Sequence, residues 1–318
     1  MSIFEGWKAI SHNSCMDGSA AGVLYKTFGG KDISFLSPSQ VDEKVREWLN
    51  NDSRKLLLAD VSVSVETAQL LEARKYDIVL LDHHKTAYPL KQFSWVEIQD
   101  PNIRCGSKML YDWIRKQLFK QFDNSLLAWK LDRLEVYERF IELVNDYDLW
   151  NKQFGKETAD LAAFHYDCLG QELFIERFLD NPSVVLTNEE KYLISVNNHK
   201  KQKEIEQSKK HIKIVNKLIQ GKERRVGFVS VSGYHNEIAE VIYSDTELNV
   251  DLVVMLFGNR ISFRAPERSG VDCSKLAEEY QGGGNIRSSG TNLSNIIGST
   301  PLDMVINGFD LQSLQNKS

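Results

Sequence analysis

A chain of 318 residues with 42% hydrophobic and 26% charged residues has the composition of a globular protein, which excludes a disordered or fibrous chain. The net charge of −5 provides no general basic field, so we expect no binding of long duplex nucleic acid. The chain contains no run of about 20 apolar residues, so no membrane span is predicted. Its four cysteines lack CxxC spacing, which favours reduced thiols. We therefore expect a cytoplasmic protein without a membrane partner, and the length predicts two domains.

Short apolar runs alternate with helical patterns over the first part of the chain, as is typical of βαβ units. Strands are expected at 7–11, 33–36, 55–62 and 77–82. Helices are expected at 19–28, 41–50, 64–75, 106–119 and 133–150. This alternation predicts the α/β fold class, with a parallel, doubly wound sheet.

A charged segment without Pro or Gly runs from 187 to 220 and is followed by Gly221, which predicts a long connecting helix. Its lysines fit a solvated helix face better than a nucleotide site. Beyond it, strands are expected at 225–232, 250–257 and 260–266, and helices at 235–244 and 272–280. The predicted domains are therefore 1–186, a connecting helix at 187–220, and a smaller α/β domain at 221–318.

Acids and imidazoles follow three of the predicted strands, and in a parallel sheet the carboxyl ends of the strands share one edge. These residues are His12, Cys15, Asp17, Asp60, Asp82, His83 and His84. Asp146 and Asp148 close a helical segment and could reach the same edge. Clustered carboxylates repel one another unless a cation joins them, and aspartates with neutral imidazoles suit Mn²⁺, with Mg²⁺, Co²⁺, Fe²⁺ or Zn²⁺ as alternatives. Two such ions would favour phosphoester hydrolysis.

Four short motifs, taken in order, resemble those of the DHH phosphoesterase superfamily. They are "HNSCMDG", "LLADVS", "DHH" and "YDLW", and "RISFRA" followed by "GVDCSKLAEEYQGGGNIRSSG" resembles the DHH-associated domain. The likeness extends over nearly the whole chain. The early H-x-x-C-x-D-G pattern is most similar to the nanoRNase, or oligoribonuclease-like, branch.

The resemblance implies a role for each residue of the first domain. Asp60 would bridge two metal ions, with His12 on the first ion and Asp17 and His83 on the second. An aspartate from later in the chain would complete the second metal site, and Asp148 fits the YDLW motif better than Asp146. His84 would contact the substrate phosphate, while Asp82 would orient the histidines. Cys15 stands where many members have an aspartate, so it is either a metal ligand or a neutral thiol that leaves the first site one ligand short.

In the smaller domain the resemblance implies a site for a second phosphate or a chain end. Arg264, Gly282, Gly283, Gly284, Asn285 and Ser288 form this candidate substrate site. Glycines let backbone N–H groups approach an anion. Asn285 replaces the usual histidine of the motif, and the glycine-rich segment by itself would also be consistent with a simple flexible turn.

The predicted function is a metal-dependent phosphodiesterase that hydrolyses short oligonucleotides, either nanoRNA or short DNA, to nucleoside monophosphates. The expected partner is a short single-stranded oligonucleotide or a dinucleotide, and a homodimer is an open alternative for the oligomeric state. Two other hypotheses remain at this point. One is the same chemistry on cyclic or linear signalling dinucleotides or on 3′-phosphoadenosine 5′-phosphate, and the other is a nucleotide-binding module that has lost catalysis.

Overall fold

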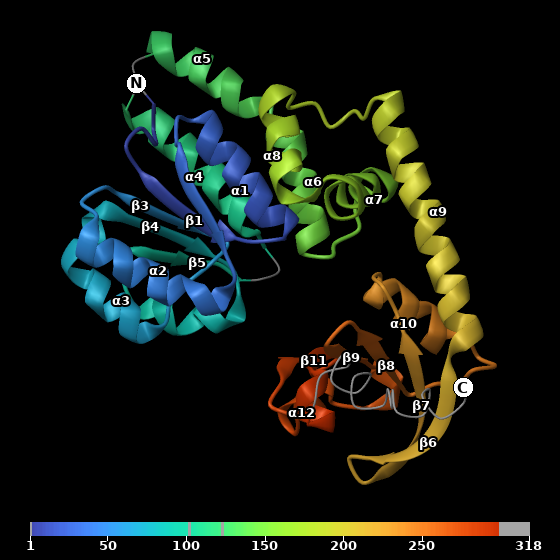
Figure 1. The fold of residues 1–318 in the computed structure, drawn as a ribbon. Helices are drawn as coiled ribbons and strands as arrows, with labels where there is room; N and C mark the ends of the chain where they lie inside the picture. Colours follow the sequence, from blue (N-terminus) through green and yellow to red (C-terminus); the bar gives the residue numbers. More distant parts are fainter. Residues whose placement is uncertain (1, 101–102, 122–123, 299–318) are drawn as a thin grey trace, which may run out of the picture. The chain divides into compact units, whose positions relative to one another are not determined.

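The computed structural model of the chain describes residues 2–100, 103–121 and 124–298. The chain divides into two compact units, Met1–Asn197 and Asn198–Ser318, and the boundary falls within helix α9, Asn188–His211. Residues 299–318, which end the predicted domain 221–318, lie outside the described residues. Each unit is built on one β-sheet with helices packed on its faces (Figure 1).

The first unit contains a parallel sheet of five short strands in the order β2-β1-β3-β4-β5. The strands are β1 Lys8–His12, β2 Asp32–Leu36, β3 Leu56–Ala59, β4 Ile78–Asp82 and β5 Val96–Ile98. The central strand β3 is buried along its whole length because helices cover both faces of the sheet. The predicted α/β fold with a parallel, doubly wound sheet is confirmed.

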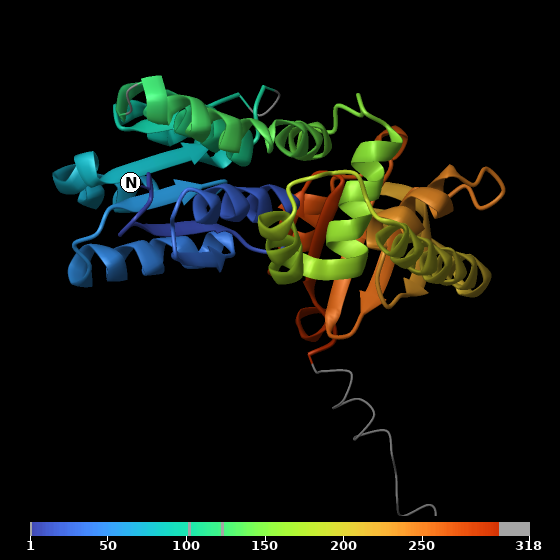
Figure 2. The same cartoon turned by 90° about the horizontal axis from the view of Figure 1, so that it is seen from above.

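Helices form a layer on each face of this sheet (Figure 1, Figure 2). α2 Pro38–Asn51 and α3 Val65–Leu71 pack on one face, where Trp48 is buried with the valines of α2. The helices of the other layer are α1 Met16–Thr27, α4 Gly106–Gln121, α6 Glu138–Asp148 and α8 Gly170–Asp180. α1 is buried almost completely, because it lies against the sheet and is covered by α4, α6 and α8. Its small residues allow this close packing.

The second unit contains a mixed sheet of six strands in the order β10-β11-β9-β8-β7-β6. The strands are β6 Lys213–Ile219, β7 Lys222–Ser230, β8 Leu252–Phe257, β9 Arg260–Arg264, β10 Gly283–Asn285 and β11 Ser288–Asn292. Only β7 and β8 pair in parallel among these described strands. α10 His235–Ser244 and the end of α9 cover one face, and α11 Cys273–Glu278 covers the other.

The predicted connecting helix 187–220 is wrong in its last part. α9 ends at His211, and the next residues form β6. The segment after His211 is rich in Ile and Val, whose branched side chains favour strands. Gln220 and Gly221 both have positive φ, 48° and 74°, which is the backbone of a tight hairpin turn into β7. Gly221 therefore closes a hairpin and does not end a helix.

Other boundaries also differ from the sequence pattern. The helix expected over 133–150 is divided between α5 Asn124–Glu135 and α6. The strand expected over 55–62 ends at Ala59, because Asp60 has a φ of +61° and turns the chain out of the sheet. β5 was not predicted, and the glycine-rich segment expected as a turn contains strand β10.

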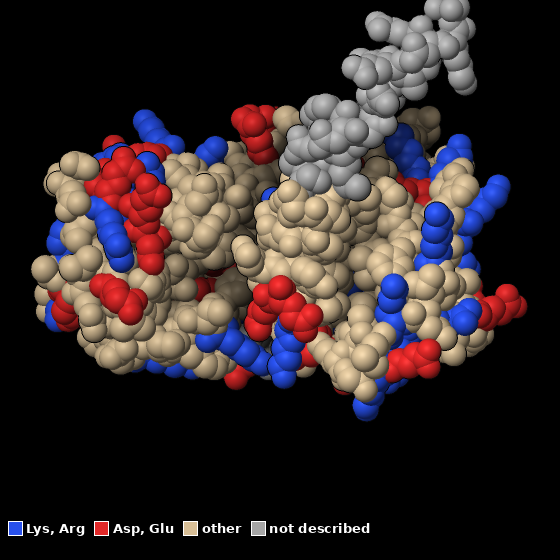
Figure 3. Space-filling view, turned by 60° about the horizontal axis from the view of Figure 1, so that its bottom comes forward, with Lys and Arg blue, Asp and Glu red and all other residues tan. Residues whose placement is uncertain are grey.

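The surface carries a mixture of charges. Lys and Arg side chains lie among Asp, Glu and uncharged residues on the face that Figure 3 shows, in agreement with the net charge of −5. Within the described ranges the structure contains no helix long and apolar enough to cross a membrane.

Candidate metal centre and substrate site

Three strands of the first unit end side by side at one edge of the sheet. Ser11 of β1 lies opposite Ala59 of β3, which lies opposite Leu81 of β4. The residues that follow these positions are His12, Asp60 and Asp82. The strand order reverses between β1 and β3, and ligands of open α/β sheets bind at such a switch point.

Asp60 lies at the centre of this edge and is only 2% exposed. Its Oδ2 atom is 3.1 Å from Cys15 Sγ and 3.7 Å from His12 Nδ1. Its Oδ1 atom is 3.4 Å from His83 Nε2 and 3.9 Å from His84 Nδ1. The two oxygens of one carboxylate therefore face two different sets of donor atoms, which is the geometry that a bridging ligand requires.

A second set of donor atoms adjoins the first through His83. Its Nε2 atom is 3.3 Å from Asp148 Oδ2 and 4.0 Å from Asp17 Oδ2. Asp17 is buried, and its carboxylate accepts hydrogen bonds from the N–H groups of Gly106 (2.7 Å) and Ser107 (2.8 Å) in the first turn of α4. This helix N-terminus stabilises a negative charge on Asp17 and fixes its orientation.

The donor atoms are close enough to hold cations. The atoms of His12, Cys15 and Asp60 lie within 4.8 Å of one another, and so do those of Asp17, His83 and Asp148. A third overlapping set contains Asp60, Asp82, His83 and His84. Both ring nitrogens of His83 are buried without a hydrogen-bond partner among the described residues. Buried polar nitrogens are normally paired, so this side chain fits the role of a metal ligand better than that of a core residue.

The charges of the cluster favour a bound cation. Burial and the charges of Asp17 and Asp148 raise the pKa of Asp60 well above its ordinary value. Burial and the charge of Asp17 raise the pKa of Asp148 to about 7. Burial lowers the pKa of both His12 and His83, so their imidazoles are neutral and can donate a lone pair. The crowded carboxylates and neutral imidazoles are compatible with divalent metal binding.

Asp82 holds the turn that carries the two histidines. It is 1% exposed, and its Oδ1 atom accepts hydrogen bonds from the backbone N–H of His83 (2.8 Å) and from Nδ1 of His84 (2.8 Å). Burial opposes its ionisation, but the hydrogen bonds from His84 keep the pKa of Asp82 below its ordinary value. The same contact raises the pKa of His84, whose side chain is 45% exposed. His84 can therefore present a proton to solvent or ligand while Asp82 supports it.

Cys15 is the N-cap of α1. Its sulfur accepts a hydrogen bond from Gly18 N–H (3.1 Å), and its thiol donates to Asp60 Oδ2 (3.1 Å). Burial and the charges of Asp60 and Asp17 raise the pKa of the Cys15 thiol. In this arrangement Cys15 is a protonated cap and hydrogen-bond donor, and a cation beside Asp60 would lower the thiol pKa.

The two late acids have different surroundings. Asp146 is 2% exposed and does not face the cluster, because its carboxylate accepts hydrogen bonds from Thr158 Oγ1 (2.6 Å) and from Gln153 N–H (2.7 Å). It is a buried acid that holds the start of α7 Lys156–Ala163. Asp148, at the end of α6, reaches His83.

Three residues from 165–171 that the sequence did not mark contact the metal-ligand loop, which we define as residues 12–17, or the helix α1 that follows it. Gln171, at the start of α8, donates to His12 O (3.1 Å) and accepts a hydrogen bond from Ser14 N–H (3.1 Å). Tyr166 Oη accepts a hydrogen bond from Met16 N–H (3.0 Å). His165, whose pKa burial lowers to about 4, lies 2.8 Å from Ser19 Oγ.

Tyr166 and His165 belong to a π-helical segment, Phe164–Leu169. Such irregular helical turns occur often at functional sites. The segment carries no signal in the sequence, because its partners lie about 150 residues earlier in the chain.

The predicted substrate residues of the second unit line a cavity of about 590 Å³, with the exception of Asn285, which is not among its lining residues. Arg264 donates hydrogen bonds to Asn236 Oδ1 (2.9 Å) and Ser262 Oγ (2.6 Å), while its Nη2 nitrogen has no acceptor among the described residues. Asn285 is exposed and pairs with Ser288 in the β10–β11 hairpin.

The three glycines of the predicted substrate site have different structural roles in this cavity. A Cβ atom at Gly282 would lie 2.2 Å from Gly290 O, and one at Gly284 would lie 2.6 Å from Ser288 O. These two glycines are required by the close approach of β11. A Cβ atom at Gly283 would meet nothing within 4 Å. Gly283 is therefore the position at which the missing side chain leaves room for a ligand.

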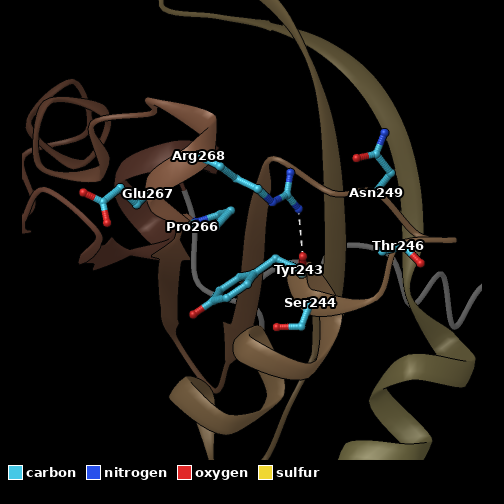
Figure 4. A pocket seen from close by; sticks show the side chains of 7 residues that line it. All are labelled: Tyr243, Ser244, Thr246, Asn249, Pro266, Glu267 and Arg268. Carbon is cyan, nitrogen blue, oxygen red and sulfur yellow. Dashed lines mark hydrogen bonds between the residues drawn. The ribbon is translucent and has the colours of Figure 1, made fainter.

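Another cavity of the second unit, of about 680 Å³, lies between the end of α10 and the segment after β9 (Figure 4). Its arginine, Arg268, donates to the backbone oxygens of Tyr243 (2.7 Å) and Val250 (3.1 Å). Glu267 adds a carboxylate to the lining. A guanidinium already engaged by the backbone beside a carboxylate makes this cavity a weaker anion site than the one around Arg264.

The chain is similar to known proteins in sequence and in fold. No family model matches the chain. The oligoribonuclease NrnB of Bacillus subtilis (strain 168) is 24% identical over 304 residues, which cover 89% of this chain and 72% of that protein.

Two solved structures show the same fold. A structure described as the DHH domain of a member of a family of ribosomal proteins matches 90% of this chain and 83% of its own chain, with 12% identity and a TM-score of 0.56. A pGpG-specific phosphodiesterase, PggH from Vibrio cholerae, matches 98% of this chain and 99% of its own chain, with 12% identity and a TM-score of 0.52. The fold of the chain thus has precedents among solved proteins.

Proposed function

We propose that the chain belongs to the DHH phosphoesterase superfamily, whose motifs it resembles, and that it is a metal-dependent phosphodiesterase that hydrolyses short oligonucleotides to nucleoside monophosphates. The relative NrnB is named an oligoribonuclease, which supports this reaction and this class of substrate. The residues of the site support the chemistry independently of that relative.

One observation carries the proposal, namely that the two oxygens of Asp60 face two sets of donor atoms. Oδ2 faces His12 and Cys15, and Oδ1 faces His83 and His84. We assign His12 and Asp60 to a first cation, with Cys15 as an additional donor. We assign Asp17, His83 and Asp148 to a second cation, with Asp60 as a shared ligand because its Oδ1 atom is 3.4 Å from His83 Nε2. Mn²⁺ suits this mixture of carboxylates and neutral imidazoles.

When bound, two such ions would supply a nucleophilic hydroxide and Lewis-acid stabilisation of a phosphoryl centre. The protein's own groups bind and orient the substrate. His84 has a raised pKa and a side chain that is 45% exposed, so it can donate a proton or a hydrogen bond to a phosphate oxygen. Asp82 fixes the orientation of His84 through the 2.8 Å contact between Oδ1 and Nδ1.

We assign the cavity around Arg264 to a phosphate of the substrate. The Nη2 nitrogen of Arg264 and the open position at Gly283 give this cavity a cation and room for an anion. Because a phosphate is common to all short oligonucleotides, this contact would not select a base sequence.

The test is release of nucleoside monophosphates from a set of substrates in Mn²⁺ and in EDTA. The set contains di- to decanucleotides of RNA and DNA, cyclic dinucleotides and 3′-phosphoadenosine 5′-phosphate. We expect Mn²⁺-dependent cleavage that is fastest on the shortest linear substrates. Preference for a cyclic dinucleotide or for 3′-phosphoadenosine 5′-phosphate would replace the proposed substrate but keep the reaction.

A matched pair of variants connects the activity to the site. Asp60→Asn should abolish turnover, whereas Asp132→Asn, at an exposed position of α5, should keep it. Activity that survives in Asp60→Asn would refute the proposal. Nucleotide binding without any cleavage by the wild type would favour a binding module instead.

A further inference from the structure

The end of helix α6 carries a tryptophan where the backbone favours glycine. Trp150 N–H donates to Tyr147 O (3.0 Å), and Asn151 N–H donates to Asp146 O (3.0 Å). These two bonds form a Schellman motif, in which the residue after the helix adopts the left-handed conformation. That residue is Trp150, with a φ of +57°. Glycine takes this conformation without strain, whereas a bulky side chain does not.

Burial does not explain the presence of this tryptophan. Trp150 is 64% exposed, so most of its indole surface faces solvent and contributes little to the core. A single exposed aromatic residue is ordinary, and Trp129 of α5 is a comparable case at 57% exposed. Trp150 differs from Trp129 because it combines exposure with an unfavourable backbone conformation. Unfavourable conformations of this kind are found often at ligand sites.

Trp150 is connected to the candidate metal centre through neighbouring aromatic rings. It follows Asp148 by two residues, and its ring lies 6.0 Å from that of Tyr147. The Tyr147 ring lies 5.6 Å from that of Tyr166, whose hydroxyl accepts the hydrogen bond from Met16 N–H in the metal-ligand loop. A row of three aromatic rings thus leads from the cluster to an exposed indole.

A positive charge accompanies the indole. Lys152 Nζ lies 4.4 Å from the centroid of the Trp150 ring, and Lys152 also has a positive φ, 56°. An exposed indole with an adjacent ammonium group presents a flat surface and a cation together. A nucleotide has the complementary pair of features, since it joins a flat base to a phosphate.

We infer that Trp150 is a stacking platform for a nucleobase of the substrate, and that Lys152 attracts a neighbouring phosphate. The inference rests on the proposed function and deepens it, because it gives the first unit a means of selecting phosphodiesters that carry bases. Stacking on an aromatic ring is tolerant of base identity, so the platform should serve all four nucleobases.

The experiment compares wild type with Trp150→Gly, Trp150→Phe and, as a matched control at an exposed tryptophan, Trp129→Ala. Two substrates are used in Mn²⁺, a 5′-phosphorylated diadenosine dinucleotide and its analogue with abasic sugars. We expect Trp150→Gly to reduce kcat/KM on the dinucleotide roughly 5- to 100-fold, mainly through KM, and to leave the abasic analogue unaffected. Trp150→Phe should recover part of the loss, and Trp129→Ala should equal wild type.

A stability measurement distinguishes stacking from a structural role. The melting temperature of Trp150→Gly should equal or exceed that of wild type, because glycine suits the left-handed position. Equal losses on both substrates, or a lower melting temperature together with no change in KM, would overturn the inference.

Binding of a phosphorothioate-linked dinucleotide, measured by calorimetry, separates this inference from the proposed function. Weaker binding to Trp150→Gly would support stacking even if the wild type cleaved nothing, in which case the proposed function alone would fail. Binding that is equal in wild type and Trp150→Gly, or binding that is undetectable in wild type, would overturn the inference.

Discussion

Replacing Asp148 by asparagine should stabilise the metal-free protein while removing a metal ligand. Burial and the charge of Asp17 raise the pKa of Asp148 from an ordinary 3.8 to about 7. For an acid this shift means that ionisation opposes folding. The opposition is absent below pH 3.8, increases between pH 3.8 and about 7, and is complete above it. The full shift corresponds to about 4 kcal/mol.

Screening by solvent reduces this free-energy difference. The Asp148 side chain is 27% exposed, so screening leaves an expected gain of about 2 kcal/mol for Asp148→Asn at pH 8. At pH 5 the folded side chain is mostly protonated, but the unfolded one is already ionised, so the penalty has reached only about two fifths of its full value and the gain should shrink to about 1 kcal/mol. The measurement is urea unfolding in EDTA at both pH values, followed by circular dichroism.

Asp146→Asn is the matched control, two residues away. Its carboxylate holds the start of α7 through Thr158 and Gln153, and these bonds keep its pKa low in spite of burial. The contribution of this ionised group is complete above its ordinary pKa and is lost as the pH falls through its lowered value. Asp146→Asn should therefore be less stable than wild type at pH 8, by about 1–3 kcal/mol.

Mn²⁺ should reverse the order of wild type and Asp148→Asn. Binding to the folded state raises the free energy of unfolding, so Mn²⁺ should stabilise wild type more than Asp148→Asn. If Asp148→Asn is no more stable than wild type in EDTA at pH 8, the carboxylate cluster is not under electrostatic strain. The reasoning from charge crowding to metal binding would then be refuted.

Three further substitutions test other parts of the site. Gly106→Ala should reduce the free energy of unfolding by about 2 kcal/mol or more, because a Cβ atom would lie 2.6 Å from Asp60 Cβ; chemical denaturation measures the loss, and wild-type stability would contradict the close packing. Gln171→Ala should weaken Mn²⁺ binding about 10-fold, since Gln171 holds the backbone of His12 and Ser14; calorimetric titration tests this, and unchanged affinity would remove its positioning role. His84→Asn should lower kcat by 100-fold or more while the affinity for Mn²⁺ stays within about threefold of wild type. If kcat and Mn²⁺ affinity both fall strongly, His84 is a metal ligand.

Local patterns in the sequence were sufficient where the structure depends on near neighbours. The apolar runs of β1, β3 and β4 and the polar residues after them were recognised because strand periodicity and strand ends are local signals. β6 was missed because its lysines continue the charge pattern of α9 without a Pro or Gly between them. There, pairing with β7 decides the conformation, and a short sequence window does not contain it.

Asp146 and Asp148 show that local sequence patterns are also insufficient to assign residues to a site. Asp146 and Asp148 have nearly the same sequence context, and only the direction of each side chain at the end of α6 separates them. Asp146 faces Thr158 and Gln153, whereas Asp148 faces His83. The sequence indicated Asp148 only through its resemblance to a motif.

The sequence by itself determined the fold class, the resemblance to the motifs of the DHH superfamily and the residue types that collect at one edge of the sheet. These follow from periodicity and from motifs whose parts are close together in the chain. Only the tertiary structure decided that Asp60 faces two sets of donors, that Gln171 and Tyr166 hold the loop after β1, and that Trp150 occupies a position suited to glycine. Those features depend on contacts between residues far apart in the chain and on the backbone conformation at single residues, which local patterns do not specify.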